Sequence, residues 1–264
     1  MKSMNGVVDT HAHLEEIANL DQALSDAKAA KVVGIIAVGS GLESNQKVLD
    51  IALAHPGFVL PAFGLHPWNI KETELERELE FLDAHANEAL AIGEVGLDYH
   101  KKVIAGASKD LQKRVLTDVL KIGRKHDKPA ALHSRYAWRD TLSLVEEAGI
   151  EKAVFHWYTG PSSVLRDIVA RGYYLSVTPA VAYHEEHRRA ARETPLDKLL
   201  LETDSPVVYG RGTESEFESR PVDVLKSLLG AALLKQITED DIAAITTENA
   251  VTLFGLHLSS GTRS

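Results

Sequence analysis

The sequence predicts a single α/β domain folded as a (β/α)₈ barrel, the TIM barrel, and three observations support this. Eight short apolar runs rich in Val, Ile and Ala alternate with longer amphipathic stretches, which is typical of parallel β/α units. The chain has 264 residues, and eight such units need about 250 residues. No Pro-, Gly- or Ser-rich linker divides residues 1–264. An open doubly wound sheet is the alternative, but no glycine-rich phosphate loop follows the first run.

The expected strands are the apolar runs themselves. Most are continuously apolar rather than alternating, which indicates strands buried on both faces. They cover Gly6–Thr10, Val32–Gly39, Phe58–Leu65, Ala89–Glu94, Pro129–His133, Ala153–His156, Tyr173–Val177 and Lys198–Thr203.

The expected helices are the amphipathic stretches between and after these strands, in which apolar residues recur at helical spacing. They cover Leu20–Ala30, Glu43–Ala54, Thr73–Glu88, Lys109–His126, Trp138–Ala148, Ser163–Ala170, Tyr183–Glu193, Pro221–Leu234 and Glu239–Phe254. The segment Val207–Ser219 follows the eighth strand and is expected to be the longest polar loop.

Composition limits the classes of function. The formal net charge is −9, from 38 acidic and 29 basic residues, which argues against a protein that coats duplex nucleic acid. The chain has no cysteine, which excludes disulfides, thiolate ligands and a cysteine nucleophile. No run reaches membrane-spanning length, and no leader precedes the first strand. We therefore expect a cytoplasmic enzyme without a membrane partner.

Polar residues with metal-ligand chemistry follow the expected strands. In a (β/α)₈ barrel the active site lies at the carboxyl ends of the strands. Four of the eight ends carry histidine and two positions carry a carboxylate. Such a cluster matches the donor set of a divalent-metal centre, and a central carboxylate can bridge two ions. Reading the ends in order gives His11 and His13, then Gly39, His66, Glu94, His133, His156, Ser176 and Asp204.

Each of these residues also has a purely structural interpretation. His66 precedes Pro and Trp and could only shape a turn, and Glu94 could pair with a nearby base. Asp204 could cap a turn, because Asp, Ser and Pro are turn formers. His133 and His156 end apolar strands, where a single histidine is usually a core residue. The seven remaining histidines are expected at the surface: His55, His85, His100, His126, His184, His187 and His257.

Seven short motifs between residues 7 and 256 resemble those of the TatD family of metal-dependent hydrolases, which belongs to the amidohydrolase superfamily of barrels. They are DTHAHL, GLHPW, GEVGLD, LHSR, FHWYTG, LLLETDSP and ENAVTLFGL, in this order. The resemblance implies two bound divalent ions, each of which could be Mg²⁺, Mn²⁺ or Zn²⁺. It also implies that Glu94 bridges the two ions and that Asp204 accepts the proton of the attacking water. The implied ligands are His11, His13, Glu94, His133, His156 and Asp204.

By the same resemblance, the implied activity is that of a deoxyribonuclease, including 3′→5′ exonuclease action on single-stranded DNA, with no obligate protein partner. His66 and Arg135 are expected to hold phosphate oxygens, although Arg135 could equally form a salt bridge. Trp68, Trp157 and Tyr158 are expected to stack on a base, or else to pack at the barrel rim.

The sequence departs from the family pattern around the expected pocket. Trp157 and Tyr158 follow the sixth-strand histidine, where a Cys or Ser followed by Phe is common, and the segment SVTPAVAYHEE lacks the usual glycine and Thr-Phe pair. These changes leave the ligands intact and leave the substrate open. The alternatives are a hydrolase acting on a small ester or lactone, and a barrel that binds metal without catalysis.

Overall fold

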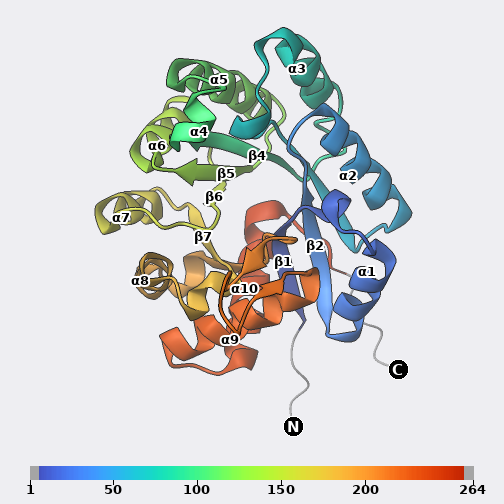
Figure 1. The fold of residues 1–264 in the computed structure, drawn as a ribbon, viewed down its shortest axis with the longest axis vertical. Coiled ribbons are helices and arrows are strands. Elements are labelled where there is room, and N and C mark those ends of the chain that lie inside the picture. The colour runs from blue at the N-terminus through green and yellow to red at the C-terminus, as the bar shows by residue number, and fades with distance from the viewer. Residues whose placement is uncertain (1–5, 259–264) are drawn as a thin grey trace.

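The computed structural model describes residues 6–258 and contains a closed eight-stranded barrel (Figure 1). The strands follow one another in chain order, and each pairs with the next in parallel. The last strand returns to the first, because the Asp204 amide donates to the His11 carbonyl at 2.9 Å and the His13 amide donates to the Ser205 carbonyl at 2.8 Å. The predicted (β/α)₈ barrel is confirmed.

The eight barrel strands lie close to the predicted runs, with two informative differences. The fourth and fifth strands extend beyond Glu94 and His133, because their pairing continues to Asp98 opposite Arg135. Glu94 is therefore inside a strand and not at its end. The strands are β1 Val7–Ala12, β2 Val32–Val38, β3 Val59–Phe63, β4 Ala91–Asp98, β5 Ala130–Arg135, β6 Ala153–Phe155, β7 Tyr174–Val177 and β8 Leu199–Leu201.

Helices surround the barrel on its outside (Figure 1). The predicted helix Thr73–Glu88 is divided into a 3₁₀ turn, Glu72–Glu74, and a shorter helix, and a four-residue helix after β4 was not predicted. The helices are α1 Leu20–Ala29, α2 Leu42–Ala54, α3 Leu75–Ala84, α4 Lys101–Ile104, α5 Lys109–Lys125, α6 Trp138–Glu147, α7 Ser162–Ala170, α8 Glu185–Glu193, α9 Val224–Lys235 and α10 Glu239–Phe254.

The segment after β8 is not only a polar loop, as predicted, but contains a small hairpin. Its strands, β9 Val208–Tyr209 and β10 Phe217–Glu218, pair in antiparallel fashion. The Tyr209 and Phe217 rings lie 5.7 Å apart, so one aromatic contact holds the hairpin together beside the carboxyl ends of the strands.

Two apolar clusters form the core. The larger one packs the helices against the outside of the strands. The smaller one contains at least one residue from each of the eight strands, together with Leu253 and Phe254 of α10. It therefore fills the barrel interior, and α10 contributes to it. In the described range, no helix has both the length and the apolar character required to cross a bilayer.

Candidate metal centre

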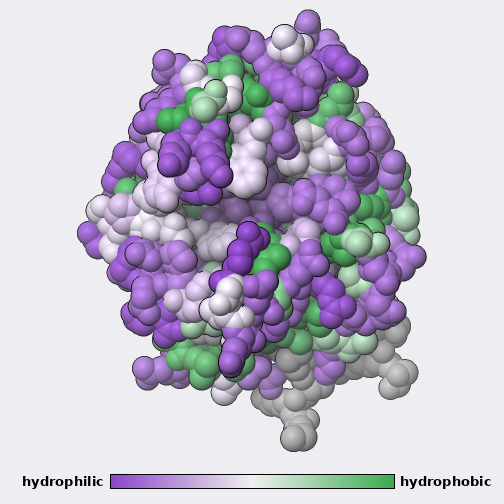
Figure 2. All heavy atoms as spheres, in the orientation of Figure 1, coloured by the Kyte–Doolittle hydropathy of each residue, from purple (hydrophilic) through white to green (hydrophobic). Residues whose placement is uncertain are grey.

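A cavity of about 540 Å³ lies at the carboxyl ends of the barrel strands. The face drawn in Figure 2 is hollowed near its middle, among hydrophilic and intermediate side chains. The sequence-predicted ligands come together at the bottom of this cavity, from β1 and the residue after it, β4, β5, and the segments after β6 and β8. They are His11, His13, Glu94, His133, His156 and Asp204.

Glu94 is at the centre of this group, and the residue is only 2% exposed. Its Oε2 atom lies 3.4 Å from His11 Nε2 and 3.3 Å from His13 Nε2. Its Oε1 atom lies 2.8 Å from both His133 Nδ1 and His156 Nε2. The two oxygens therefore face two different pairs of imidazoles, which is the arrangement of a carboxylate that can bridge two cations.

Asp204 extends the first of these two groups. Its Oδ1 atom lies 3.6 Å from His11 Nε2 and 3.5 Å from His13 Nε2. Its backbone has a φ of 49°, in the left-handed region that Asp tolerates better than most residues, and its carboxylate is turned toward the imidazoles. Donor atoms of His11, His13 and Asp204 all lie within 4.8 Å of one another, as do donor atoms of His66, Glu94 and His133.

The electrostatics of the group favour positive charge. Burial alone would raise the pKa of Glu94, but the charge of the surrounding imidazoles holds it well below its ordinary value. Burial alone would lower the pKa of His13, but hydrogen bonds to Asp204 and Glu94 raise it well above its ordinary value. In such a field, bound cations would take the place of the imidazole protons.

Several imidazole nitrogens in the group have no hydrogen-bond partner within residues 6–258. They are both ring nitrogens of His11 and the Nδ1 atoms of His13 and His156. Buried polar atoms without a partner are rare and costly. Imidazole nitrogens and carboxylate oxygens are also the donors that Zn²⁺ and Mn²⁺ accept, so these residues fit a divalent-metal site.

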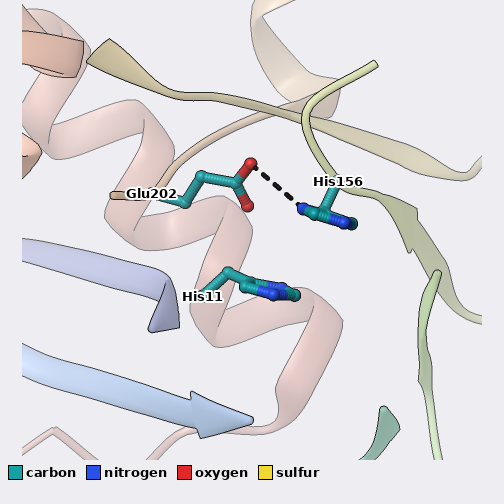
Figure 3. Close-up of side chains that lie close together, drawn as sticks. All are labelled: His11, His156 and Glu202. Atoms are coloured by element: carbon teal, nitrogen blue, oxygen red, sulfur yellow. Dashed lines mark ion pairs between the residues drawn. The ribbon is translucent and has the colours of Figure 1, made fainter. Parts of the chain in front are cut away.

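Glu202 is a buried carboxylate that the sequence analysis did not single out, although it belongs to the quoted LLLETDSP motif. It lies beside the imidazoles of His11 and His156, as Figure 3 shows, with Oε1 3.6 Å from His156 Nδ1. The same oxygen accepts a hydrogen bond from the Trp157 amide at 2.9 Å. The His156 ring stacks on the ring of His11 at 4.2 Å. A carboxylate in this place helps to fix the orientation of an imidazole ligand.

Asp98 is a second buried carboxylate missed from the sequence, because the strand that carries it was expected to end at Glu94. Its Oδ2 atom accepts from Trp68 Nε1 at 2.7 Å and lies 2.8 Å from Arg135 Nη2 and 3.3 Å from His133 Nε2. Burial alone would raise the pKa of Asp98, but these bonds lower it. Asp98 therefore joins His133, one of the candidate ligands, to two side chains of the cavity wall.

His66 lies next to the second donor group. Its Nδ1 atom accepts a hydrogen bond from the Trp68 amide at 3.1 Å, and its Nε2 atom lies 3.5 Å from Glu94 Oε1. Burial lowers its pKa to about 3, so the ring is neutral. Because Nδ1 is an acceptor, the proton lies on Nε2. His66 is thus a hydrogen-bond donor toward the cavity.

The prediction that Tyr158 stacks on a substrate base is wrong. Its side chain is only 1% exposed, packs against Trp138 and donates a hydrogen bond to the Pro161 carbonyl at 2.9 Å. The preceding Trp157 has a φ of 38°, and this turn directs Tyr158 into the core while Trp157 itself lines the cavity. Trp68 also lines the cavity and is 62% exposed.

The prediction of a surface position for His187 is also wrong. Its side chain is 1% exposed. Nε2 accepts from the Thr178 amide at 3.1 Å, and Nδ1 lies 3.1 Å from the Tyr158 carbonyl, to which it donates. Burial lowers its pKa to about 4. His187 therefore links the segments that follow β6 and β7, whereas the other six histidines are at least partly exposed.

Comparison with known proteins identifies the family. The family model described as "TatD related DNase" matches residues 8–255. The chain belongs to the TatD-related DNase family. It is similar to the human deoxyribonuclease TATDN3, with 32% identity over 94% of each chain. It is also similar to the metal-dependent hydrolase YabD of Bacillus subtilis, with 33% identity over 94% of this chain and 99% of that protein.

The crystal structure of the TatD homologue YJJV from Escherichia coli has the same fold, with a TM-score of 0.84 at 26% identity, covering 95% of this chain and 98% of that chain. The predicted TatD family membership is confirmed, and with it the prediction of a metal-dependent hydrolase. The TatD assignment covers nearly the whole barrel, including all the strands that carry the metal-facing residues.

Proposed function

We propose that the chain is a deoxyribonuclease that uses two divalent ions to remove nucleotides from the 3′ end of single-stranded DNA. The observation that carries this proposal is the position of Glu94, whose two oxygens face separate imidazole pairs. Two adjacent ions suit phosphodiester hydrolysis, because they stabilise both the attacking and the leaving oxygen. The name of the human relative, a deoxyribonuclease, points to the same bond.

The proposed ligands divide into two sets that share one carboxylate. His11, His13 and Asp204 would hold one ion, and His133 and His156 the other, with Glu94 between them. The ions would be Mg²⁺, Mn²⁺ or Zn²⁺. When bound, they supply positive charge that acidifies a water molecule and offsets the charge of the phosphate.

Three side chains of the protein have the remaining roles in this proposal. Asp204 accepts the proton of the attacking water, because imidazoles hold its pKa below the ordinary value, against the effect of burial, and keep it ionised. His66 donates from Nε2 to a phosphate oxygen. Arg135, held by Asp98 through Nε and Nη2, pairs with the phosphate through its remaining nitrogen.

The walls of the cavity suit a flexible strand end. Trp68 and Trp157 both line the cavity, and base stacking on aromatic rings depends little on sequence. A volume of about 540 Å³ is within the range of small-molecule sites and fits a strand end better than a duplex. The net charge of −9 also agrees with a substrate that contacts the protein only at this cavity and not along a broad basic surface.

The proposal is tested with single-stranded DNA and chelated protein, to which Mg²⁺, Mn²⁺ or Zn²⁺ is returned separately. Strands labelled at the 5′ end should shorten progressively in the presence of a metal. Asp204→Asn should lower the rate about 10²- to 10⁴-fold, the usual contribution of a general base. Asp197→Asn is the matched control, because Asp197 is an exposed carboxylate near the opposite end of the same strand, β8.

Three results would contradict the proposal in whole or in part. Full activity in the metal-free protein would exclude the proposed role of the ions. Absence of DNA cleavage with every metal, combined with hydrolysis of a small ester or lactone, would favour the alternative activity at the same site. Cleavage of DNA from the 5′ end or within the strand would retain the nuclease and exclude the proposed polarity.

A further inference from the structure

The cavity of about 540 Å³ that contains the candidate ligands is called here the metal cavity. A second pocket lies beside it, and Trp68 and Arg135 form part of the lining of both. Its volume is about 440 Å³, which is enough for a small-molecule ligand. The two neighbouring pockets differ in their acidic residues. Carboxylates line the metal cavity, whereas the second pocket has Arg135, His100 and Lys102 and no acidic residue in its lining. We call it the cationic pocket.

The cationic wall of this pocket is available for a ligand. Lys102 is exposed and forms no ion pair with any residue between 6 and 258. Arg135 uses Nε and Nη2 on Asp98, which leaves its Nη1 atom without a hydrogen bond in the described part of the chain. Asp98 balances the charge of Arg135, so Lys102 supplies the excess positive charge of this lining. In a protein with a net charge of −9, such a lining without an acidic residue favours an anion.

The pocket wall is also held in place by one buried carboxylate. Asp98 Oδ1 accepts from the His100 amide at 2.8 Å and from Arg135 Nε at 3.0 Å. Asp98 Oδ2 accepts from Trp68 Nε1 at 2.7 Å. The backbone before α4 and both shared side chains are therefore fixed before any ligand arrives, which reduces the entropy lost on binding.

The remaining lining is apolar. Pro67, Ile70, Val103 and Ala107 contribute to it, and the Arg135 guanidinium lies 5.4 Å from the centre of the Trp68 ring. An anionic group combined with a flat, weakly polar group is the chemistry of a nucleotide. Stacking on aromatic or apolar surfaces and contact with basic side chains are the general means of binding single strands.

We propose that the cationic pocket binds the nucleotide next to the scissile phosphate, with its phosphate near Lys102 and Arg135 and its base against the apolar lining. The inference rests on the proposed nuclease function, because the ligand would be the same strand whose end enters the metal cavity. The strand passes over Trp68 and Arg135, the two residues common to both pockets.

The test uses Lys102→Ala with Lys101→Ala as the matched control. The two lysines are adjacent and exposed on α4, but only Lys102 lines the pocket. Binding of fluorescein-labelled hexathymidylate, with phosphorothioate linkages that resist cleavage, to the metal-loaded protein is measured by anisotropy over a range of salt. Lys102→Ala should weaken binding about fivefold at low salt and reduce the salt slope by about 0.7, the value for one phosphate contact. Lys101→Ala should change neither quantity.

A second measurement separates this inference from the proposed function. Bis(p-nitrophenyl) phosphate has no neighbouring nucleotide, so Lys102→Ala in the otherwise native chain should hydrolyse it at the native rate. Equal effects of the two lysine substitutions on hexathymidylate binding would overturn the cationic pocket, whether or not the chain cleaves DNA. A native chain that cleaves neither substrate, while Lys102→Ala still weakens binding selectively, would overturn the nuclease and retain the pocket.

Discussion

His187 should make the folded chain lose stability below neutral pH. Its pKa falls from an ordinary value of 6.5 to about 4 through burial, so the ring stays neutral in the folded state while the unfolded chain takes up a proton. Where the unfolded state binds more protons, stability decreases as the pH falls. This contribution is present above pH 6.5 and is lost toward pH 4. At 1.36 kcal/mol per pH unit, the loss amounts to about 3 kcal/mol.

The replacement His187→Gln should remove this pH dependence. Glutamine can accept from the Thr178 amide and donate to the Tyr158 carbonyl, as His187 does, but it does not titrate. Urea unfolding of both proteins at several pH values between 7.5 and 4.5 gives the free energies of unfolding. The free energy of unfolding of the variant should rise relative to that of the native chain as the pH falls, because all other groups titrate equally in both.

The matched control is His257→Gln, because His257 is exposed, and its substitution should leave the pH profile of stability unchanged. Parallel profiles for the native chain and His187→Gln from pH 7.5 to 4.5 would refute the reasoning. They would mean that His187 is protonated as easily in the folded state as in the unfolded one.

Three further results are expected. Glu94→Gln should bind fewer metal ions per chain than the native protein, because the two donor groups lose the charge that they share. Elemental analysis after dialysis measures the number of ions, and an unchanged number would exclude a bridging role. Asp98→Asn should weaken Mn²⁺ binding about 10- to 100-fold in calorimetry, since the native Asp98 Oδ2 lies 3.3 Å from His133 Nε2 and orients that ring. An unchanged Mn²⁺ affinity would contradict this role of Asp98. Phe155→Ala should lower the free energy of unfolding in urea by about 3–5 kcal/mol, because Phe155 is fully buried; a loss below about 1 kcal/mol would show that the core collapses around the site.

The barrel could be predicted from local patterns, because each apolar run and each amphipathic stretch signals its own element. The histidines next to the runs could likewise be assigned to one end of the barrel, since parallel strands bring their carboxyl ends together. Local patterns do not set the limits of a strand, because pairing with a distant strand decides where it ends. β4 continues from Glu94 to Asp98 because β5 pairs with it, and that partner is more than thirty residues away in the chain.

The residues around the candidate ligands could not be assigned from sequence, because contacts between distant segments decide their positions. His187 is on a helix with many charged residues and resembles a surface histidine, yet amide and carbonyl groups of two other segments bury it. Tyr158 is next to Trp157, and only the backbone turn at Trp157 shows which of them faces the cavity. Glu202 is close to Asp204 in the chain, but its contact with His156 depends on the closure of the barrel.

Asp98 connects the metal centre and the cationic pocket, and this determines which substitutions can distinguish their roles. The carboxylate contacts His133 of the candidate metal centre, and Arg135 and Trp68, which line both pockets. Any change at Asp98 therefore alters both, and loss of Arg135 would leave that carboxylate buried without its main cation, which costs stability. Lys102 has neither connection. Its substitution changes the charge of the cationic pocket alone, so an effect of Lys102→Ala on strand binding would be independent of the metal centre.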